Sequence, residues 1–513
     1  MTAPAETLLA LLAARDDAPA IAAPGRKALD FAALRRLLGE VRAGLNAHGI
    51  GRGDAVAIVL PNGPEMATSF IAVGAAATAA PLNPAYRQDE FDFYLGDLKP
   101  KAVILAAGSE SPAAAAAKAR GIPIIALKAG EGDPAGAFTL DMSALSKRPA
   151  VKPGPAEAGD VALVLHTSGT TARPKIVPLS NANLAASARH IATSLALKPG
   201  DLCLNIMPLF HIHGLIAAVL SSLSAGASVS CTPGFNALKF FGWLREVKPT
   251  WYTAVPTMHQ AILARAASNP GDARAAKLRL VRSSSASLPP QVFHELEEAF
   301  GCPIVEAYGM TEAAHQMASN PLPPRPRKPG SVGLAAGPEV ALMDDEGNLV
   351  TGDEVGEVVI RGPNVTSGYA ENPEANAKAF TKGWFRTGDQ GRFDSEGYLF
   401  LTGRLKELIN RGGEKVSPLE VDTVLLDHPA VAQVVTFAVP HPKLGEEVAA
   451  VAVLREGQSL TERELRDFAA KRLADFKVPR RVVFVTEIPK GATGKVQRIG
   501  LAEKLGLTNP ASA

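Results

Sequence analysis

The sequence predicts an α/β fold, because buried strands alternate with helices through most of the chain. Continuous apolar runs that end in polar or turn residues are typical of buried parallel strands, and four such runs are present: 55–62, 101–107, 161–167 and 202–208. Helical stretches such as 181–196 and 291–300 lie between strand-like segments, which is the alternation expected for an α/β architecture.

Two changes of pattern toward the C-terminus predict further units. After about residue 330 the strands are shorter and separated by Gly turns, which indicates a small antiparallel β subdomain with strands at 356–362, 383–389 and 397–403. The last hundred residues predict an α+β unit made of these segments: a helix at 417–429, strands at 431–439 and 447–454, and a helix at 461–473. We place the boundary after Gly403, which gives domains 1–403 and 404–513.

The amino-acid composition excludes several classes of function. Apolar residues make up 47% of the 513 residues, enough for large cores, and 53 Lys and Arg against 51 Asp and Glu leave a net charge of +2. Near-neutral charge gives no electrostatic reason to expect nucleic acid or a polybasic membrane anchor as partner. Three cysteines without metal spacing, and no signal-peptide pattern, predict a cytoplasmic protein.

The apolar stretch 214–231 contains no charged residue and is long enough to raise the question of a membrane span. Its serines and the break at Gly226 favour a buried helix followed by a strand. We therefore expect no membrane partner.

The strongest local signal is HTSGTTARPK at 166–175, directly after the apolar strand 161–165. Small residues allow backbone N–H groups to approach an anion, the hydroxyls add donors, and the lysine adds a charge. The segment is not a P-loop, because Pro174 precedes the lysine and Ile176 follows it. It predicts a phosphate-binding loop made of Thr167, Ser168, Gly169, Thr170, Thr171, Ala172, Arg173, Pro174 and Lys175.

With this loop the chain resembles the adenylate-forming superfamily, which includes acyl-CoA synthetases, luciferases and peptide-synthetase adenylation domains. Six motifs occur in the family's order: TSGTTARPK at 167–175, PLFHIHG at 208–214, YGMTE at 308–312, RTGD at 386–389, the segment 403–421, and PKGATGKVQR at 489–498. The resemblance covers nearly the whole chain. It implies stacked α/β subdomains in the large domain and a mobile C-terminal domain.

The resemblance also implies a reaction in two steps, with ATP and coenzyme A as co-substrates and Mg²⁺ as cofactor. A carboxylate attacks the α-phosphorus of ATP and expels pyrophosphate, and a thiol then displaces AMP from the acyl-adenylate. Because two anions must meet in the first step, the site needs cations and positioning more than acid–base groups.

Residue roles follow from matching positions. By resemblance, Lys495 is the catalytic lysine, Thr311 contacts the α-phosphate, and Glu312 holds Mg²⁺, for which a carboxylate oxygen is an apt ligand. The matching positions also assign the nucleotide's ribose and adenine contacts to Asp389, Arg404, Glu306, Ala307 and Tyr308.

In the C-terminal domain, Lys406 matches the hinge of acyl-CoA synthetases, about which this domain turns between the two steps. Gly412 and Gly413 match the loop that lines the channel for coenzyme A, where glycine allows close backbone approach.

The acyl pocket has unusual polarity. Fatty and aromatic acids take mainly apolar pockets, because burying an unpaired polar group costs about 1–3 kcal/mol. Donors and cations instead fit a small acid with a second carboxylate, and the candidates are Arg282, Ser284, Ser285, His211 and His315. By resemblance His211 also shapes and gates the pocket. His213 lies in the same motif as His211, and the sequence does not decide which histidine touches the acid.

Within the superfamily the chain is most similar to the oxalate-CoA ligase group, through the segments RSSSAS, TWYTAVPTMHQ, EAYGMTEAAHQMASNPLP and INRGGEKVSP. The expected products are oxalyl-CoA, AMP and pyrophosphate. Malonate, another short acid, an adenylation domain that does not use coenzyme A, and a regulatory nucleotide-binding protein remain alternatives. Monomer and homodimer are both open.

Overall fold

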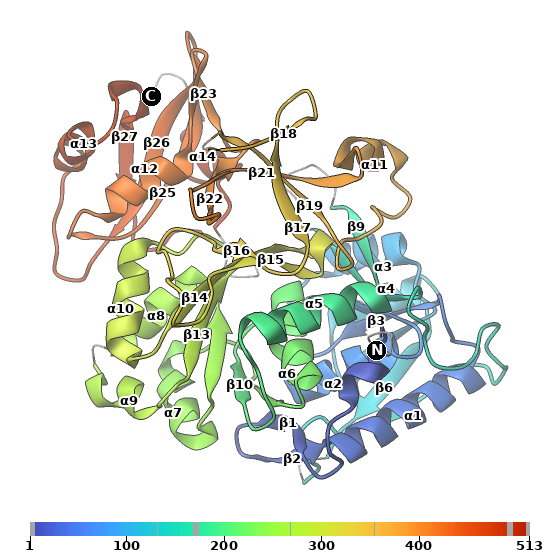
Figure 1. Cartoon of the computed structure of the whole chain (residues 1–513). Coiled ribbons are helices and arrows are strands. Elements are labelled where there is room, and N and C mark those ends of the chain that lie inside the picture. Colours follow the sequence, from blue (N-terminus) through green and yellow to red (C-terminus); the bar gives the residue numbers. More distant parts are fainter. Residues whose placement is uncertain are drawn as a thin grey trace.

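The computed structural model describes residues 6–130, 132–167, 174–266, 268–352, 354–489 and 496–508. Their strands form four sheets. Figure 1 shows the two large sheets with their helices in the lower part, an antiparallel sheet above them, and the C-terminal sheet at the upper left. The predicted α/β class, with a large N-terminal and a smaller C-terminal part, is confirmed.

The first large sheet has seven strands in the order β7-β6-β5-β3-β4-β8-β9, and its central pairs are parallel. Its strands are β3 (Ala55–Val59), β4 (Thr78–Pro81), β5 (Ala102–Ala106), β6 (Ile124–Lys128), β7 (Thr139–Asp141), β8 (Val161–His166) and β9 (Ile176–Ser180). Its helices are α1 (Phe31–Ala47), α2 (Pro64–Gly74), α3 (Gln88–Leu98) and α4 (Pro112–Ala119).

The second large sheet has nine strands in the order β16-β15-β14-β13-β12-β10-β11-β1-β2. Its strands are β1 (Pro19–Ala23), β2 (Arg26–Asp30), β10 (Leu202–Asn205), β11 (Ser228–Cys231), β12 (Trp251–Ala254), β13 (Leu280–Ser284), β14 (Ile304–Met310), β15 (His315–Ser319) and β16 (Leu334–Ala335). Its helical segments are η1 (Leu9–Leu12), α5 (Asn181–Ser194), η2 (His213–Leu220), α6 (Ser221–Ser224), α7 (Ala237–Val247), α8 (Pro256–Ala266), α9 (Pro270–Ala275), α10 (Pro290–Phe300) and η3 (Thr311–Ala313).

The two faces of the nine-stranded sheet have different cores. Along β13, Leu280 belongs to the core that joins both large sheets through α5 and η2, whereas Val281 belongs to the core under α7, α8 and α10. Because side chains alternate along a strand, Arg282 and Ser284 face the same side as Leu280. This alternation aims polar side chains of β12 and β13 toward η2.

The stretch 214–231 folds as predicted, into buried η2 and α6 followed by β11. Among the described residues, no helix combines the length and the apolarity needed to span a membrane. η2 is a π-helix, a form that is rare and often found at functional sites.

The predicted antiparallel subdomain is confirmed. It consists of β17 (Glu339–Met343), β18 (Leu349–Val350), β19 (Gly356–Arg361), α11 (Pro373–Ala379), β20 (Phe380–Thr381), β21 (Trp384–Phe393) and β22 (Leu399–Arg404).

The C-terminal part has a five-stranded sheet and its own core. Its elements are β23 (Ile409–Arg411), β24 (Glu414–Val416), α12 (Pro418–Leu426), β25 (Val431–His441), β26 (Gly445–Leu454), α13 (Glu462–Ala470), η4 (Asp475–Lys477), β27 (Arg481–Phe484) and α14 (Leu501–Lys504). It contacts the large domain through polar groups: Gln260 on α8 donates to the Ala432 carbonyl (3.3 Å), and Arg455 pairs with Glu295 on α10 (3.5 Å). Polar contacts such as these suit a domain that can move.

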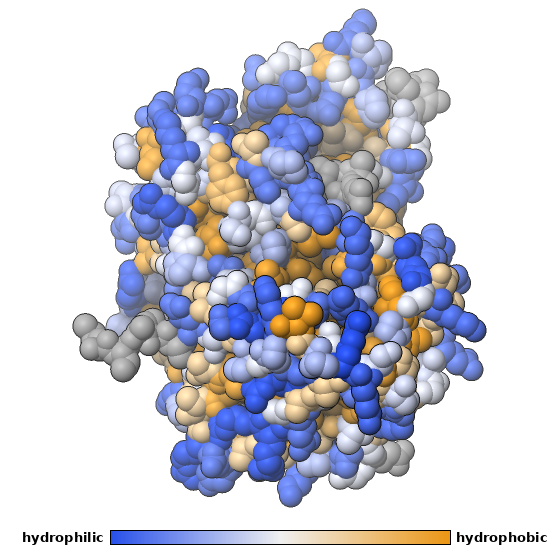
Figure 2. Space-filling model, turned by 90° about the vertical axis from the view of Figure 1, so that its right-hand side faces the viewer, coloured by the Kyte–Doolittle hydropathy of each residue, from blue (hydrophilic) through white to orange (hydrophobic). Residues whose placement is uncertain are grey.

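The surface in Figure 2 is largely hydrophilic, and apolar residues gather in a hollow near the middle of that face. The large apolar side chains that are exposed include Val151 and Leu238, which lie far apart in the sequence.

Candidate active site

The predicted phosphate loop connects β8 and β9, which pair as an antiparallel hairpin. Its base is closed twice: the Thr167 N–H donates to the Lys175 carbonyl (2.9 Å), and the Lys175 N–H donates to Thr167 Oγ1 (3.1 Å). His166, just before the loop, lies 3.1 Å from Asp97 Oδ2 on α3 through its Nε2. The predicted residues Ser168, Gly169, Thr170, Thr171, Ala172 and Arg173 lie outside the described residues.

A buried tyrosine links this loop to Glu312. The Tyr369 hydroxyl donates to Glu312 Oε1 (2.9 Å), and Lys175 Nζ lies 4.3 Å from the centroid of the Tyr369 ring. Burial raises the pKa of Glu312, and burial together with nearby Lys406 lowers the pKa of Lys175. The structure therefore brings together a predicted phosphate cation and a predicted metal ligand, and adds Tyr369, which sequence reasoning missed.

A second cluster joins β14 to the antiparallel sheet. The Tyr308 hydroxyl donates to Asp389 Oδ2 (2.5 Å), and Arg404 Nε lies 3.1 Å from Asp389 Oδ1. Asp389 and Arg404 are register partners on β21 and β22. Burial and the Asp389 carboxylate raise the pKa of Tyr308, and Asp389 raises the pKa of Arg404. Three residues predicted to contact the nucleotide are thus one hydrogen-bonded group.

The remaining predicted nucleotide residues lie on β14 and the turn after it. Glu306 is buried, its carboxylate accepts from the Gly330 N–H (3.1 Å), and burial raises its pKa to about 8. The Ala307 carbonyl accepts from the Ser284 hydroxyl (2.8 Å), which ties the end of β13 to β14. Thr311 begins η3 and is half-buried.

The acyl-pocket candidates meet around His213. Its Nδ1 lies 3.0 Å from Ser285 Oγ, and its ring is 5.0 Å from the His315 ring, edge to face. The backbone N–H of His213 donates to the ring nitrogen Nδ1 of His211 (3.2 Å), so a hydrogen bond joins the two histidines of this motif. His213 is fully buried and His315 is 1% exposed. The sequence named His213 without assigning it to the pocket, and the structure places it at the centre.

Backbone strain marks the same place. Ser285 (φ 76°), Ala314 (φ 46°) and His315 (φ 105°) all have positive φ although none is glycine. Such conformations cost of order 1–3 kcal/mol each and cluster at functional sites. His213 itself begins the π-helix η2. Two rare backbone features therefore converge on the neighbouring side chains of His213, Ser285 and His315.

The acyl and nucleotide groups share one hairpin. Met310 on β14 pairs with His315 on β15, and the turn between them is η3, which carries Thr311 and Glu312. β12, β13 and β14 run parallel, so these groups lie at the carboxyl ends of the strands, where open α/β sheets bind ligands.

Arg282 and Ser284 lie deeper than the other predicted contacts. Arg282 is fully buried, and its Nη1 and Nη2 donate to Thr253 Oγ1 (3.5 Å) and Gln316 Oε1 (3.3 Å). Ser284 is 1% exposed and its hydroxyl donates to Ala307, as above. Among the predicted acyl contacts, the structure places Ser285 and His315 around His213, and Arg282 behind them.

The C-terminal candidates divide into two places. Lys406, the predicted hinge residue, is close enough to Lys175 for its charge to lower the pKa of that lysine. Gly412 (φ 60°) and Gly413 (φ 100°) form the turn between β23 and β24, at the top of Figure 1, away from α8 and α10. Lys495 lies outside the described residues.

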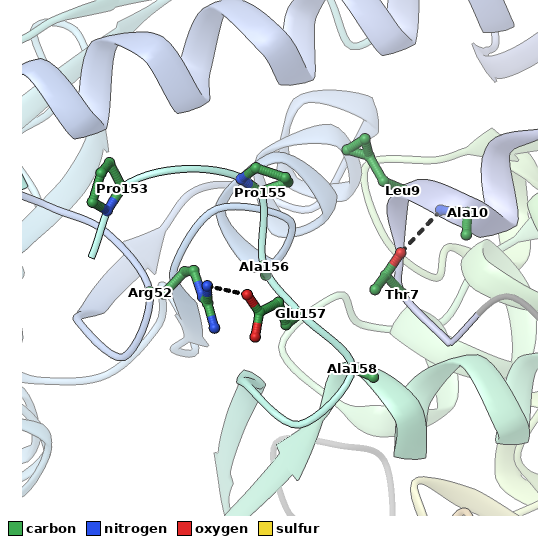
Figure 3. Close-up of a pocket in the computed structure, with 9 residues that line it drawn as sticks. All are labelled: Thr7, Leu9, Ala10, Arg52, Pro153, Pro155, Ala156, Glu157 and Ala158. Atoms are coloured by element: carbon green, nitrogen blue, oxygen red, sulfur yellow. Dashed lines mark hydrogen bonds and ion pairs between the residues drawn. The ribbon is translucent and has the colours of Figure 1, made fainter.

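A surface pocket of about 760 Å³ lies elsewhere, between η1 and the segment 153–158 (Figure 3). Its one guanidinium, Arg52, is paired with Glu157 and with Asp160 (2.6 Å). None of the predicted site residues lines this pocket. With its cation already neutralised, it offers nothing to a phosphate or a carboxylate.

Comparison with known proteins gives the family. The AMP-binding enzyme model matches residues 11–370, and the AMP-binding enzyme C-terminal domain model matches residues 420–495. An oxalate–CoA ligase of Arabidopsis thaliana is 48% identical over 94% of both chains, and one of Saccharomyces cerevisiae is 44% identical over 88% of this chain and 87% of that one. Among solved structures, ATP-bound MatB from Rhodopseudomonas palustris superposes with a TM-score of 0.87 at 31% identity, covering 97% of this chain and 98% of that one.

The family models together match well over half of the chain, and the first of them covers Tyr308, Glu312 and Tyr369. The chain belongs to the AMP-binding enzyme family.

Proposed function

We propose that this protein is an oxalate–CoA ligase, which joins oxalate to coenzyme A and converts ATP to AMP and pyrophosphate. The observation that carries the proposal is the polar acyl pocket of His213, His315 and Ser285, buried at the strand ends beside the nucleotide cluster. It is supported by the relatives named oxalate–CoA ligase. An acid with a long apolar chain would leave these buried polar groups without partners.

In the first step one oxalate oxygen attacks the α-phosphorus of ATP, and the bond to the pyrophosphate oxygen breaks. Lys175 and Lys495 stabilise the phosphate charge, and Thr311 contacts the α-phosphate. Asp389 accepts the ribose hydroxyls, Arg404 lies near the ribose and phosphates, and Tyr308 stacks on the adenine. Ser285 and His315 hold the distal carboxylate.

Glu312 fits a site for Mg²⁺, because its carboxylate is buried and its Tyr369 partner donates to Oε1 only. The described residues hold no cluster of three or more His, Cys, Asp or Glu that suits a metal. Mg²⁺ bound mainly by phosphates and water, with one protein carboxylate, is the usual arrangement in nucleotide sites. When bound, Mg²⁺ supplies positive charge against the phosphate oxygens.

In the second step the sulfur of coenzyme A attacks the acyl carbon and AMP leaves. We propose that the C-terminal domain rotates about Lys406 between the steps and brings the Gly412–Gly413 turn to the pocket. There this turn lines the path of the thiol. The polar contacts of this domain with α8 and α10 are consistent with such a rotation.

A substrate panel tests the proposal. Release of AMP that depends on coenzyme A is measured with oxalate, malonate, acetate, butyrate and octanoate. We expect the highest kcat/KM with oxalate, and pyrophosphate as the second product. A preference for malonate would keep the ligase and change the acid, whereas a preference for octanoate, or ADP as product, would contradict the proposal.

His315→Ala tests the pocket. We expect the KM for oxalate to rise about 10- to 100-fold, because this is the size of effect expected when one hydrogen bond to a charged group is lost. The KM for acetate should change little. The exposed His294→Ala serves as control, because it removes a histidine away from the pocket. An equal change for both acids would remove His315 from the substrate site.

A further inference from the structure

Arg282 is a buried cation whose hydrogen-bond partners are neutral. It is fully buried in β13 and, within the part of the chain that the structure describes, its guanidinium donates to Thr253 and Gln316. Burial lowers its pKa to about 9, so the guanidinium is still charged at neutral pH. A buried charge without a counter-charge lowers the stability of the folded state. Stability alone therefore does not explain an arginine at this position.

A chain of hydrogen bonds leads from this cation to the acyl pocket. Thr253 and Arg282 are register partners on β12 and β13, and Thr253 Oγ1 lies 3.5 Å from Arg282 Nη1 and 2.6 Å from His213 Nε2. His213 Nδ1 lies 3.0 Å from Ser285 Oγ. The order is therefore Arg282, Thr253, His213, Ser285.

The cation favours one direction of this chain. A guanidinium only donates, so the Thr253 oxygen turns a lone pair toward Arg282. A second N–H on the same oxygen would bring two positive ends together, which favours the arrangement in which the Thr253 hydrogen points to His213 Nε2. His213 then accepts at Nε2, carries its proton at Nδ1, and donates to Ser285 Oγ. The hydroxyl hydrogen of Ser285 is then left to donate to an acceptor in the pocket. A carboxylate oxygen is such an acceptor.

The opposite direction would give the opposite pocket. If His213 carried its proton at Nε2, Ser285 would donate to His213 Nδ1 and would present only lone pairs to the acid. Two lone pairs facing a carboxylate repel it. The direction of the chain, and not only the presence of its members, therefore decides whether Ser285 attracts the substrate.

Arg282 also fixes the strand on the other side of the pocket. Its Nη2 donates to Gln316 Oε1, which leaves the Gln316 amide nitrogen to donate to Ser194 Oγ (2.9 Å) and to the Ala336 carbonyl (3.0 Å). Gln316 follows His315 on β15. One cation thus orients groups on both strands that carry the pocket.

We propose that Arg282 is a positioning residue that holds His213 in the Nδ1–H form, so that Ser285 donates to the second carboxylate of the acid. Arg282 itself does not touch the substrate. The identity of that acid rests on the proposed function, whereas the histidine form does not.

Thr253→Val and Thr253→Ser form a matched pair for the kinetic test. Valine has the shape of threonine without the hydroxyl and breaks the chain, whereas serine keeps it. We expect Thr253→Val to raise the KM for oxalate about 10- to 100-fold, with kcat and the KM for ATP little changed, and Thr253→Ser to stay near the wild type. Equal behaviour of the two variants would contradict the chain.

The second readout needs no substrate. In full-length protein labelled with ¹⁵N-histidine, the His213 ring signals are assigned by their loss in His213→Gln. We expect the Nδ1–H form in the wild type and in Arg282→Lys, and loss of that preference in Arg282→Met and in Thr253→Val. If Arg282→Met does not fold, Thr253→Val and Arg282→Lys still carry the comparison.

The Nε2–H form in the wild type, or an unchanged Nδ1–H form in the folded Arg282→Met and Thr253→Val variants, would overturn the proposal. If the acid panel fails for oxalate while the histidine form behaves as expected, the proposed function is wrong and the positioning role of Arg282 stands.

Discussion

Lys495→Ala is expected to slow acyl-adenylate formation about 10²- to 10³-fold while largely sparing thioester formation from a pre-made acyl-adenylate. The first step brings two anions together, and removing one aligned cation from such a site has an effect of this size. The second step has a neutral acyl carbon as its target, so it depends less on that charge. The two steps are measured separately, by pyrophosphate release and by AMP release from the synthetic adenylate.

A described residue close to Lys495 in the sequence indicates how this lysine would move with its domain. Arg498, three residues later, pairs with Glu407 (3.2 Å) and with buried Asp422 (2.7 Å). Glu407 directly follows the proposed hinge residue Lys406. Arg498 is thus tied to the residue next to the proposed hinge, and a turn of the domain would carry Lys495 with it and take its charge out of the second step.

Lys504→Ala is the matched control, since Lys504 is an exposed lysine of the same domain on α14. It should leave both steps unchanged. Equal loss of both steps in Lys495→Ala would contradict the assignment of this lysine to adenylate formation.

Local sequence patterns predicted the fold class and several central strands, because these strands are buried on both faces and appear as continuous apolar runs. β3, β5, β8 and β10 all lie within the apolar runs that predicted them. The short hairpin of β23 and β24 was not predicted, although the sequence contains a signal for it. That signal is the pair Gly412–Gly413, which forms the two-residue turn of the hairpin. Motif order, and not spacing alone, pointed to Glu312, Tyr308 and Asp389.

What the sequence could not give is the set of contacts between distant segments. Tyr369 meets Glu312 from 57 positions away, and Thr253 meets His213 from 40 positions away. No local pattern sets such distances, because they depend on which strands lie side by side. The strained backbone of Ser285 and His315 is likewise imposed by packing, since neither residue favours positive φ by itself.

Glu312→Gln is expected to lower the rate of adenylate formation about 10²-fold at a fixed Mg²⁺ concentration and to raise the Mg²⁺ concentration needed for half-maximal rate. Glutamine keeps the size and an acceptor for the Tyr369 hydroxyl, so the pocket should be preserved. It removes the negative charge that we propose for the Mg²⁺ site. Exposed Glu374→Gln, which removes a carboxylate paired with Lys378, is the control and should change neither quantity.

The pH dependence of the Mg²⁺ requirement gives the sharper test. Burial raises the pKa of Glu312, so protons occupy this carboxylate at a higher pH than they would an exposed one. A protonated carboxyl is a poor ligand for Mg²⁺, so the Mg²⁺ concentration for half-maximal rate should rise as the pH falls toward that raised pKa. In Glu312→Gln this rise should be smaller, because the amide does not titrate and only the phosphates of ATP still exchange protons for Mg²⁺. The same slope in wild type and variant would place the titrating group, and with it the Mg²⁺ site, somewhere other than Glu312.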